Sequence, residues 1–361
     1  MTYDVERLRA RMPALESGVA FFDGPGGTQT PDVIALAIAG AMTAGMSNRS
    51  RVTQAERNAD DVTLAARQAA ADLVNADLRG IVFGRSATSL TFEVARTLAQ
   101  GWGPGDEVIV TRLDHDANIR PWVTAAERAG ATVRWAAFDP ATAALEPQSV
   151  TDLINERTRL VAVTGASNLL GTRPDLATIA AAVHQADALF YVDGVHLTAH
   201  APIDMQAIDA DFFVCSPYKF LGPHNAFLAA SPALLETMHP DKLKPATEDV
   251  PERFELGTLQ YELLAGVTAA IDMLADLVPG DEATMSRRAR LVRSMVALEE
   301  YEDGLHARMR AGLESLAGIE LFSHAPVRTP TELFRFAGID SQDVYRGLAG
   351  QGVNAPAGSF Y

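Results

Sequence analysis

The stretch Phe212-Phe-Val-Cys-Ser-Pro-Tyr-Lys219-Phe-Leu-Gly-Pro223 decides the fold of this chain. Its first four residues are apolar and predict a short buried strand, and the Gly and Pro residues beyond the lysine predict a turn. Lys219 therefore follows the carboxyl end of a strand, where open parallel sheets bind ligands. Only two other lysines occur, Lys242 and Lys244. This scarcity favours a lysine used for chemistry, as an amine that forms a Schiff base with a carbonyl, over an ordinary loop lysine.

Short apolar runs alternate with helical patterns on both sides of this stretch, which predicts βαβ units and a mainly parallel seven-stranded sheet. The four helices expected between them cover residues 89–100, 121–129, 150–157 and 175–185. The seven predicted strands are residues 81–83, 107–111, 132–136, 160–164, 189–193, 212–215 and 226–230.

The pattern changes after an irregular, Pro-containing stretch at residues 240–253. Two long helices are expected there, at 259–277 and 282–316, followed by a short αβ tail at 319–323, 332–336, 342–350 and from Val353 onward. We therefore expect three parts: an N-terminal segment (1–20) that packs on the smaller domain, a large α/β domain (21–255) and a small C-terminal α+β domain (256–361).

Charge and composition narrow the class of protein. Thirty basic against forty-six acidic side chains leave a net charge of −16, which disfavours binding to nucleic acid or to anionic membranes. No run of eighteen apolar residues and no secretory signal is found, so a cytoplasmic protein is expected. Cys215 is the only cysteine, and no metal site is expected.

Three further polar segments follow predicted strands. Tyr191-Val-Asp193-Gly-Val-His196 offers a carboxylate that can pair with a protonated pyridine nitrogen, although a helix cap or a salt bridge is the ordinary alternative. Gly84-Arg-Ser-Ala87-Thr88 precedes a helix and resembles a phosphate cradle, or a simple N-cap. In Leu113-Asp-His115-Asp-Ala-Asn118 the imidazole can stack on a planar ligand, or be a solvated loop histidine.

Together these segments resemble the class V aminotransferase superfamily, and most closely its cysteine desulfurase-like branch of enzymes that use pyridoxal 5′-phosphate (PLP). The resemblance runs from Phe22-Asp-Gly-Pro-Gly-Gly27 to Tyr361 and is strongest in Val192–His196 and Ser216–Pro223. It implies a fold-type I PLP-dependent transferase-like structure, a homodimer, and an aldimine between PLP and Lys219 that serves reactions of a small amino acid.

The resemblance also implies the roles of individual residues. Asp193 would pair with the pyridine nitrogen and His115 would stack on the ring. Asn168, in Ser167-Asn-Leu-Leu-Gly171, would face the phenolic oxygen or the substrate, and His196 would face the phenolic oxygen. The phosphate would be held by Ala87, Thr88, Ser216 and Tyr218, which replaces a histidine usual before the lysine, and a cross-subunit contact would come from Thr258 or Tyr261.

Two departures from the family pattern bear on the reaction. A desulfurase needs a cysteine on a mobile C-terminal loop, whereas Cys215 lies at the end of a predicted strand and is expected to be a small core residue. Relatives continue beyond the position of Tyr361 and supply an arginine for the substrate carboxylate there, so the small domain is expected to be incomplete. We therefore expect C–S/β-lyase or aminotransferase-type chemistry; the alternative is a catalytically impaired PLP-binding protein with a regulatory or binding role.

Two rival classes find less support. A nicotinamide-binding domain predicts Gly-x-Gly-x-x-Gly after the first strand, and the glycine-rich run Asp23-Gly-Pro-Gly-Gly-Thr28 lacks that spacing. A zinc hydrolase needs three ligands, and His196 and His200 have no recognisable third partner in the sequence.

Overall fold

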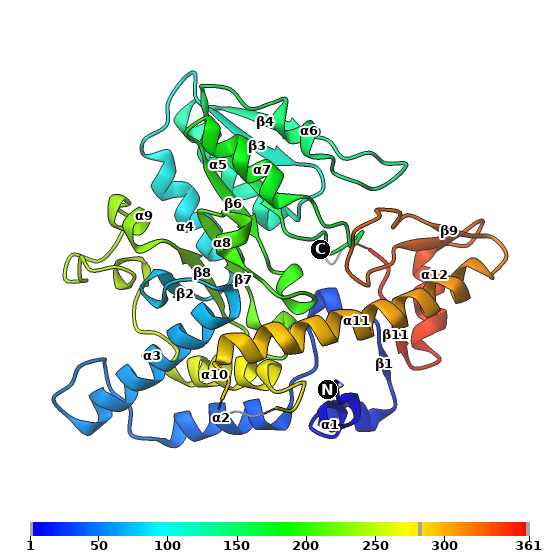
Figure 1. Cartoon of the computed structure of the whole chain (residues 1–361), viewed down its shortest axis with the longest axis horizontal. Helices are drawn as coiled ribbons and strands as arrows, with labels where there is room; N and C mark the ends of the chain where they lie inside the picture. Colours follow the sequence, from blue (N-terminus) through cyan, green and yellow to red (C-terminus); the bar gives the residue numbers. More distant parts are fainter. Residues whose placement is uncertain (1–2, 281–283, 359–361) are drawn as a thin grey trace.

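A seven-stranded sheet forms the centre of the computed structural model, which describes residues 3–280 and 284–358 (Figure 1). The strand order is β2-β8-β7-β6-β5-β3-β4, and β8 is antiparallel to both neighbours while the pairs from β7 to β4 are parallel. The prediction of a mainly parallel sheet is thus confirmed. Its strands are β2 (Ile81–Gly84), β3 (Glu107–Thr111), β4 (Thr132–Ala136), β5 (Thr158–Thr164), β6 (Leu189–Asp193), β7 (Phe212–Cys215) and β8 (Ala226–Ala230).

Successive side chains of a strand point to opposite faces of the sheet, and the buried strands therefore contribute to two apolar cores, one on each face. In β6, Phe190 and Val192 belong to one core and Tyr191 to the other. This explains why the central strands are continuous apolar runs, since both faces are covered by helices. Each fully buried Val or Phe contributes about 1.5–3 kcal/mol relative to an exposed side chain.

Helices from distant parts of the chain cover the two faces. The core with Tyr191 contains side chains from α4 (Ala87–Ala99), α5 (Arg120–Ala129) and α9 (Pro232–Thr237). The core with Phe190 contains side chains from the remaining helices that flank the sheet: α2 (Asp32–Thr43), α3 (Gln54–Val74), α6 (Pro147–Thr151), α7 (Leu176–Gln185), α8 (Met205–Ile208), α10 (Tyr261–Ala275) and α11 (Arg287–Glu314).

Several helices differ from the sequence prediction, among them the short α8 and α9, which it did not include. Neither α2 nor α3 was predicted, although Thr53 and Glu56 form a capping box at the start of α3 that is readable in sequence. The helix predicted over 150–157 was wrong, because α6 ends at Thr151. Beyond it the Asn155 side chain donates to Leu153 O at 3.3 Å and accepts from Arg157 N at 2.9 Å. Such side-chain bonds compete with the helical backbone pattern.

The C-terminal elements lie to one side of the sheet, and the long α11 runs from beneath the sheet toward them (Figure 1). They are β9 (Ile319–Leu321), β10 (Phe334–Phe336), α12 (Ser341–Ala349) and β11 (Val353–Asn354). Near α1 (Val5–Arg9), β1 (Ala20–Phe21) pairs with β11, and the Tyr3 and Tyr301 rings meet edge to face at 5.2 Å. The N-terminal segment therefore contacts C-terminal elements.

Two predicted features fall partly outside the described residues: the helix start at Glu282, and the chain end after Gly358. None of the helices in the described ranges is both long enough and apolar enough to cross a membrane.

Candidate active site

The carboxyl ends of the parallel strands surround a cavity of about 200 Å³. Nine of the eleven predicted site residues line it: Ala87, Thr88, His115, Asn168, Asp193, His196, Ser216, Tyr218 and Lys219. The cavity also has lining residues to which we had given no role, namely Pro25, Gly26, Ser86, Ala117, Thr164, Ala166 and Val195. Segments separated by up to about two hundred residues thus meet because parallel strands end at one sheet edge.

Lys219 lies at the end of a short 3-10 turn directly after β7. Its amine donates to the carbonyl of Pro25 and lies 4.8 Å from the centre of the Tyr218 ring. Burial lowers the pKa of Lys219 to about 8, opposed by the nearby Asp193 carboxylate. A substantial fraction of this amine is therefore neutral, and nucleophilic, near pH 8.

Asp193 is the last residue of β6 and is 7% exposed. Burial raises its pKa to about 6, while the Val195 N–H, which donates to Oδ1 at 2.9 Å, and the charge of Lys219 act in the opposite direction. No cationic side chain forms an ion pair with Asp193 among residues 3–280 and 284–358. A carboxylate buried in this way is stabilised once a cation binds beside it.

The amino end of α4 forms another part of the cavity wall. Ser86 caps the helix and exchanges hydrogen bonds with Ser89 in a capping box. The backbone N–H groups of the first turn, including those of Ala87 and Thr88, have no partner within the helix itself. Together with the helix dipole they favour a bound anion, and Ser216 lines the same cavity.

His115 follows β3 and is held by its own loop, because its Nδ1 accepts from Ala117 N at 3.0 Å. Burial, and then the charge of Lys219, lower its pKa, so the ring is neutral near pH 7. Beside it, the buried Asp114 accepts from Asn118 Nδ2 at 2.6 Å and from Thr111. Burial raises the pKa of Asp114 to about 7. Asp114 carried no predicted role, although it adjoins His115 in the sequence.

His196 connects the cavity wall to the C-terminal part of the chain. Its Nε2 lies 2.9 Å from Thr329 Oγ1 and 3.1 Å from Thr331 Oγ1. Burial, aided by His200 and Lys219, lowers the pKa of His196 well below its ordinary value, so the ring stays neutral. Thr329 N also donates to Gly171 O at 2.9 Å, in the loop that carries Asn168. No local sequence signal identified these threonines, which lie more than 130 residues from His196.

Thr258 and Tyr261 do not line the cavity of this single chain. Gly257, just before them, has a φ of +82°, and Tyr261 begins α10, where burial raises its pKa. Their predicted contact is with the site of a neighbouring subunit, so it stays a prediction.

Cys215 is fully buried at the end of β7. Burial raises the pKa of its thiol well above the ordinary value. The expectation that this cysteine is a small core residue is confirmed.

Known proteins resemble the chain over nearly its whole length. Residues 20–360 match the family described as aminotransferase class-V. The protein MT3887 of Mycobacterium tuberculosis is 35% identical over 99% of this chain and 89% of its own length. A cysteine desulfurase of Klebsiella pneumoniae is 31% identical over 91% of this chain and 81% of its own.

A solved structure agrees. The cysteine desulfurase CsdA from Escherichia coli superposes with a TM-score of 0.87 and 28% identity, over all of this chain and 89% of that one. Sequence, strand order and the residues at the strand ends thus lead to one assignment. The chain belongs to the class V aminotransferase family, whose enzymes depend on PLP.

Proposed function

We propose that this protein is a PLP-dependent enzyme that removes a group from the β-carbon of a small amino acid, with C–S bonds as the first candidates. The observation that carries the proposal is that Lys219 and Asp193 line one cavity, while the only thiol of the chain, Cys215, is buried. Lys219 and Asp193 serve chemistry at the α-carbon of the substrate. The buried thiol argues against sulfur transfer through an enzyme persulfide.

The residues present fit PLP. A carboxylate that is buried without an ion-pair partner in the described chain, Asp193, matches a protonated pyridine nitrogen. The first turn of α4 and Ser216 match a phosphate group. Lys219, whose pKa is about 8, matches an aldehyde.

PLP, when bound, supplies an electron sink that stabilises negative charge at the α-carbon of an amino acid. Side chains of the protein contact the ring and accept the substrate proton. Asp193 keeps a positive charge at the ring nitrogen, and the neutral His115 offers a planar surface. The Lys219 amine accepts the proton from the substrate α-carbon, for which its lowered pKa suits it near pH 8.

Sulfur transfer requires an accessible thiolate. Burial holds the Cys215 thiol in its protonated form, and its side chain belongs to a core cluster of apolar residues. Elimination at the β-carbon needs no enzyme thiol, because a proton acceptor and an electron sink suffice.

Assays on cysteine test this proposal. Wild type and Cys215→Ala are both expected to release pyruvate and sulfide at similar rates, because Cys215 does not reach the substrate. Aminotransferase chemistry would instead require an added 2-oxo acid before cysteine is consumed. Release of alanine by wild type, with a persulfide on the protein that Cys215→Ala and Cys215→Ser both lose, would show that the proposal is wrong.

We also propose a homodimer. Apolar side chains at the start of the chain and before α10 are exposed, among them Leu36 and Met42 of α2, Val52 at 80% exposure, and Leu256. The loop with Val52 is tied to the segment before Thr258 by an ion pair between Arg49 and Glu252 at 2.8 Å. Burying these side chains against a second copy of the chain would stabilise the folded state of both subunits.

Sedimentation of the cofactor-loaded protein is expected to show a dimer. Val52→Asp is expected to shift the equilibrium toward monomers, because it places a charge in the proposed interface. The matched control Leu316→Asp alters an exposed leucine after α11 and should leave the dimer intact. A stable, PLP-loaded wild-type monomer would contradict the dimer.

A further inference from the structure

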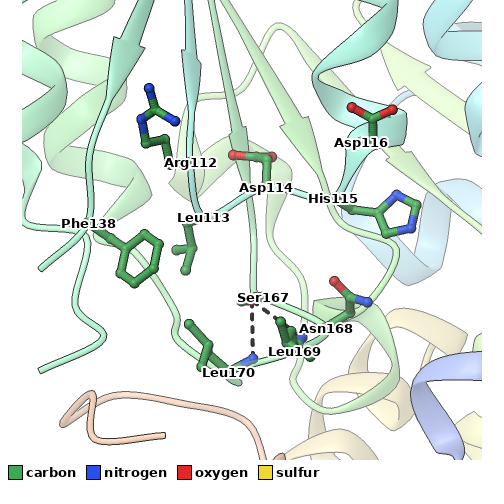
Figure 2. Close-up of a pocket in the computed structure, with 10 residues that line it drawn as sticks. All are labelled: Arg112, Leu113, Asp114, His115, Asp116, Phe138, Ser167, Asn168, Leu169 and Leu170. Atoms are coloured by element: carbon green, nitrogen blue, oxygen red, sulfur yellow. Dashed lines mark hydrogen bonds between the residues drawn. The ribbon is translucent and has the colours of Figure 1, made fainter. Parts of the chain in front are cut away.

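A second cavity, of about 220 Å³, adjoins the site (Figure 2). His115 and Asn168 line both cavities and form the boundary between them. Figure 2 shows Leu113, Phe138 and Leu170 gathered on one side of the second cavity, opposite His115 and Asn168. Any molecule that occupies both cavities therefore passes these two shared side chains.

Two polar groups of the second cavity, the Ser167 hydroxyl and the Asp114 carboxylate, are already bonded within the protein. Ser167 Oγ accepts from Leu170 N at 3.2 Å and from Leu169 N at 3.4 Å. The Asp114 carboxylate accepts from Asn118 and Thr111. Both acceptor positions of the Ser167 hydroxyl are therefore used, and each Asp114 oxygen already accepts one hydrogen bond.

Two charged side chains, Asp116 and Arg112, lie at its edge. Asp116 forms an ion pair with Arg120 at 3.3 Å. The Arg112 guanidinium lies 5.3 Å from the centre of the Trp135 ring, and Figure 2 shows it directed away from Leu113 and Leu170. The surface left for a ligand is thus formed by Leu113, Phe138, Leu169 and Leu170. Leu113 and Leu170 are buried, so this surface is part of the folded core and does not depend on mobile side chains.

The boundary between the two cavities, formed by His115 and Asn168, is polar. The Asn168 amide makes no hydrogen bond to the part of the chain that the structure describes. It lines both the cavity that contains Lys219 and the cavity with the apolar surface. A polar boundary next to an apolar cavity suits a molecule with one polar end and one apolar end.

We propose that the second cavity binds the substrate's side chain and selects amino acids whose side chains are apolar and extend beyond the β-carbon. This inference rests on the proposed function and adds the substrate class to it. Asn168 then contacts the polar end of the substrate. Leu113, Phe138, Leu169 and Leu170 contact its side chain.

Equilibrium titration of the PLP-loaded protein tests this selectivity. The visible absorbance of the bound cofactor reports binding of alanine, 2-aminobutyrate, norvaline, leucine and phenylalanine, with aspartate and glutamate as acidic counterparts. We expect the Kd to fall by at least about tenfold for each methylene group that enters an apolar pocket. The acidic amino acids are expected to bind more weakly than 2-aminobutyrate, because their carboxylates would be desolvated against Leu113, Phe138 and Leu170, from which the Arg112 guanidinium is directed away.

Two variants locate the selectivity. Leu169→Ala and Phe138→Ala are each expected to lower the ratio of leucine affinity to alanine affinity by at least about tenfold. A ratio is insensitive to partial loss of folded or loaded protein. The matched control Leu316→Ala changes an exposed leucine far along the chain and should retain the wild-type ratio.

Four results would overturn the inference. Preferred binding of aspartate or glutamate, or an unchanged ratio in both cavity variants, would show that this cavity does not receive the side chain. Amino acids that bind with equal affinities would exclude the selectivity while leaving the proposed function intact. If no amino acid alters the absorbance, the proposed function fails and this inference fails with it.

Discussion

Lys219→Ala is expected to abolish covalent attachment of PLP and to lower turnover of amino acids by at least about 10³-fold. The variant removes both the amine that reacts with the aldehyde and the group that accepts the α-carbon proton; loss of a positioned acid or base alone costs roughly 10²–10⁴-fold. Lys219 is the only one of the three lysines that lines the cavity. Burial lowers its pKa to about 8, so its amine loses a proton readily near that pH.

Borohydride reduction followed by peptide mass spectrometry measures this attachment. Wild type should carry the reduced adduct on the peptide with Lys219, and Lys219→Ala should carry none. The matched control is Lys242→Ala, because Lys242 pairs with Glu248 at 2.7 Å and donates to Ala246 O at 3.0 Å, outside the cavity. An adduct that persists on Lys242 or Lys244 in the Lys219 variant would disprove the assignment.

Asp193→Asn is expected to change activity and stability in opposite directions. An amide does not keep the pyridine nitrogen protonated, so exchange of the substrate α-proton should fall by at least about 10²-fold, the usual effect of removing one electrostatic stabiliser. The cofactor should still bind, since Lys219 and the start of α4 are unchanged.

The stability effect follows from the pKa of Asp193, which the fold raises from 3.8 to about 6. The folded protein therefore binds this proton more tightly than the unfolded chain, and its stability falls as the pH rises from about 4 through 6. Two pKa units correspond to about 3 kcal/mol, which is the upper limit of the gain. Without PLP, the Asn variant should therefore unfold at higher denaturant concentration than wild type at pH 8.

Chemical denaturation of the protein without PLP, at pH 8 and at pH 5, measures this gain. It should shrink at pH 5, because the wild-type carboxyl is then largely protonated in the folded state. Asp116→Asn is the matched control: Asp116 is exposed and paired with Arg120, so its loss should have little effect. A wild-type protein more stable than Asp193→Asn at pH 8 would show that Asp193 is not destabilising, and unchanged α-proton exchange would exclude its proposed role.

The sequence by itself determined the sheet and which strand-end residues meet at one cavity. The strands at 107–111, 132–136, 189–193, 212–215 and 226–230 have the predicted bounds. Those at 107–111, 189–193, 212–215 and 226–230 were readable because a strand buried on both faces is a short apolar run between turn residues. The residues at the strand ends or shortly after them, such as Asp193 and Lys219, were readable for a related reason. Strand ends of a parallel sheet meet at one edge, so local sequence position is enough to bring them together.

Only the tertiary structure decided the remaining contacts. The hydroxyls of Thr329 and Thr331 reach His196, and the second cavity forms where the loop after β5 meets Phe138. The end of α6 depended on Asn155, whose side chain competes with the helix. Hydrophobic periodicity records which face of an element is buried, but not which distant side chain packs against it. Side-chain contacts such as those of His196 with Thr329 and Thr331 arise from packing the whole chain, and no local pattern encodes them.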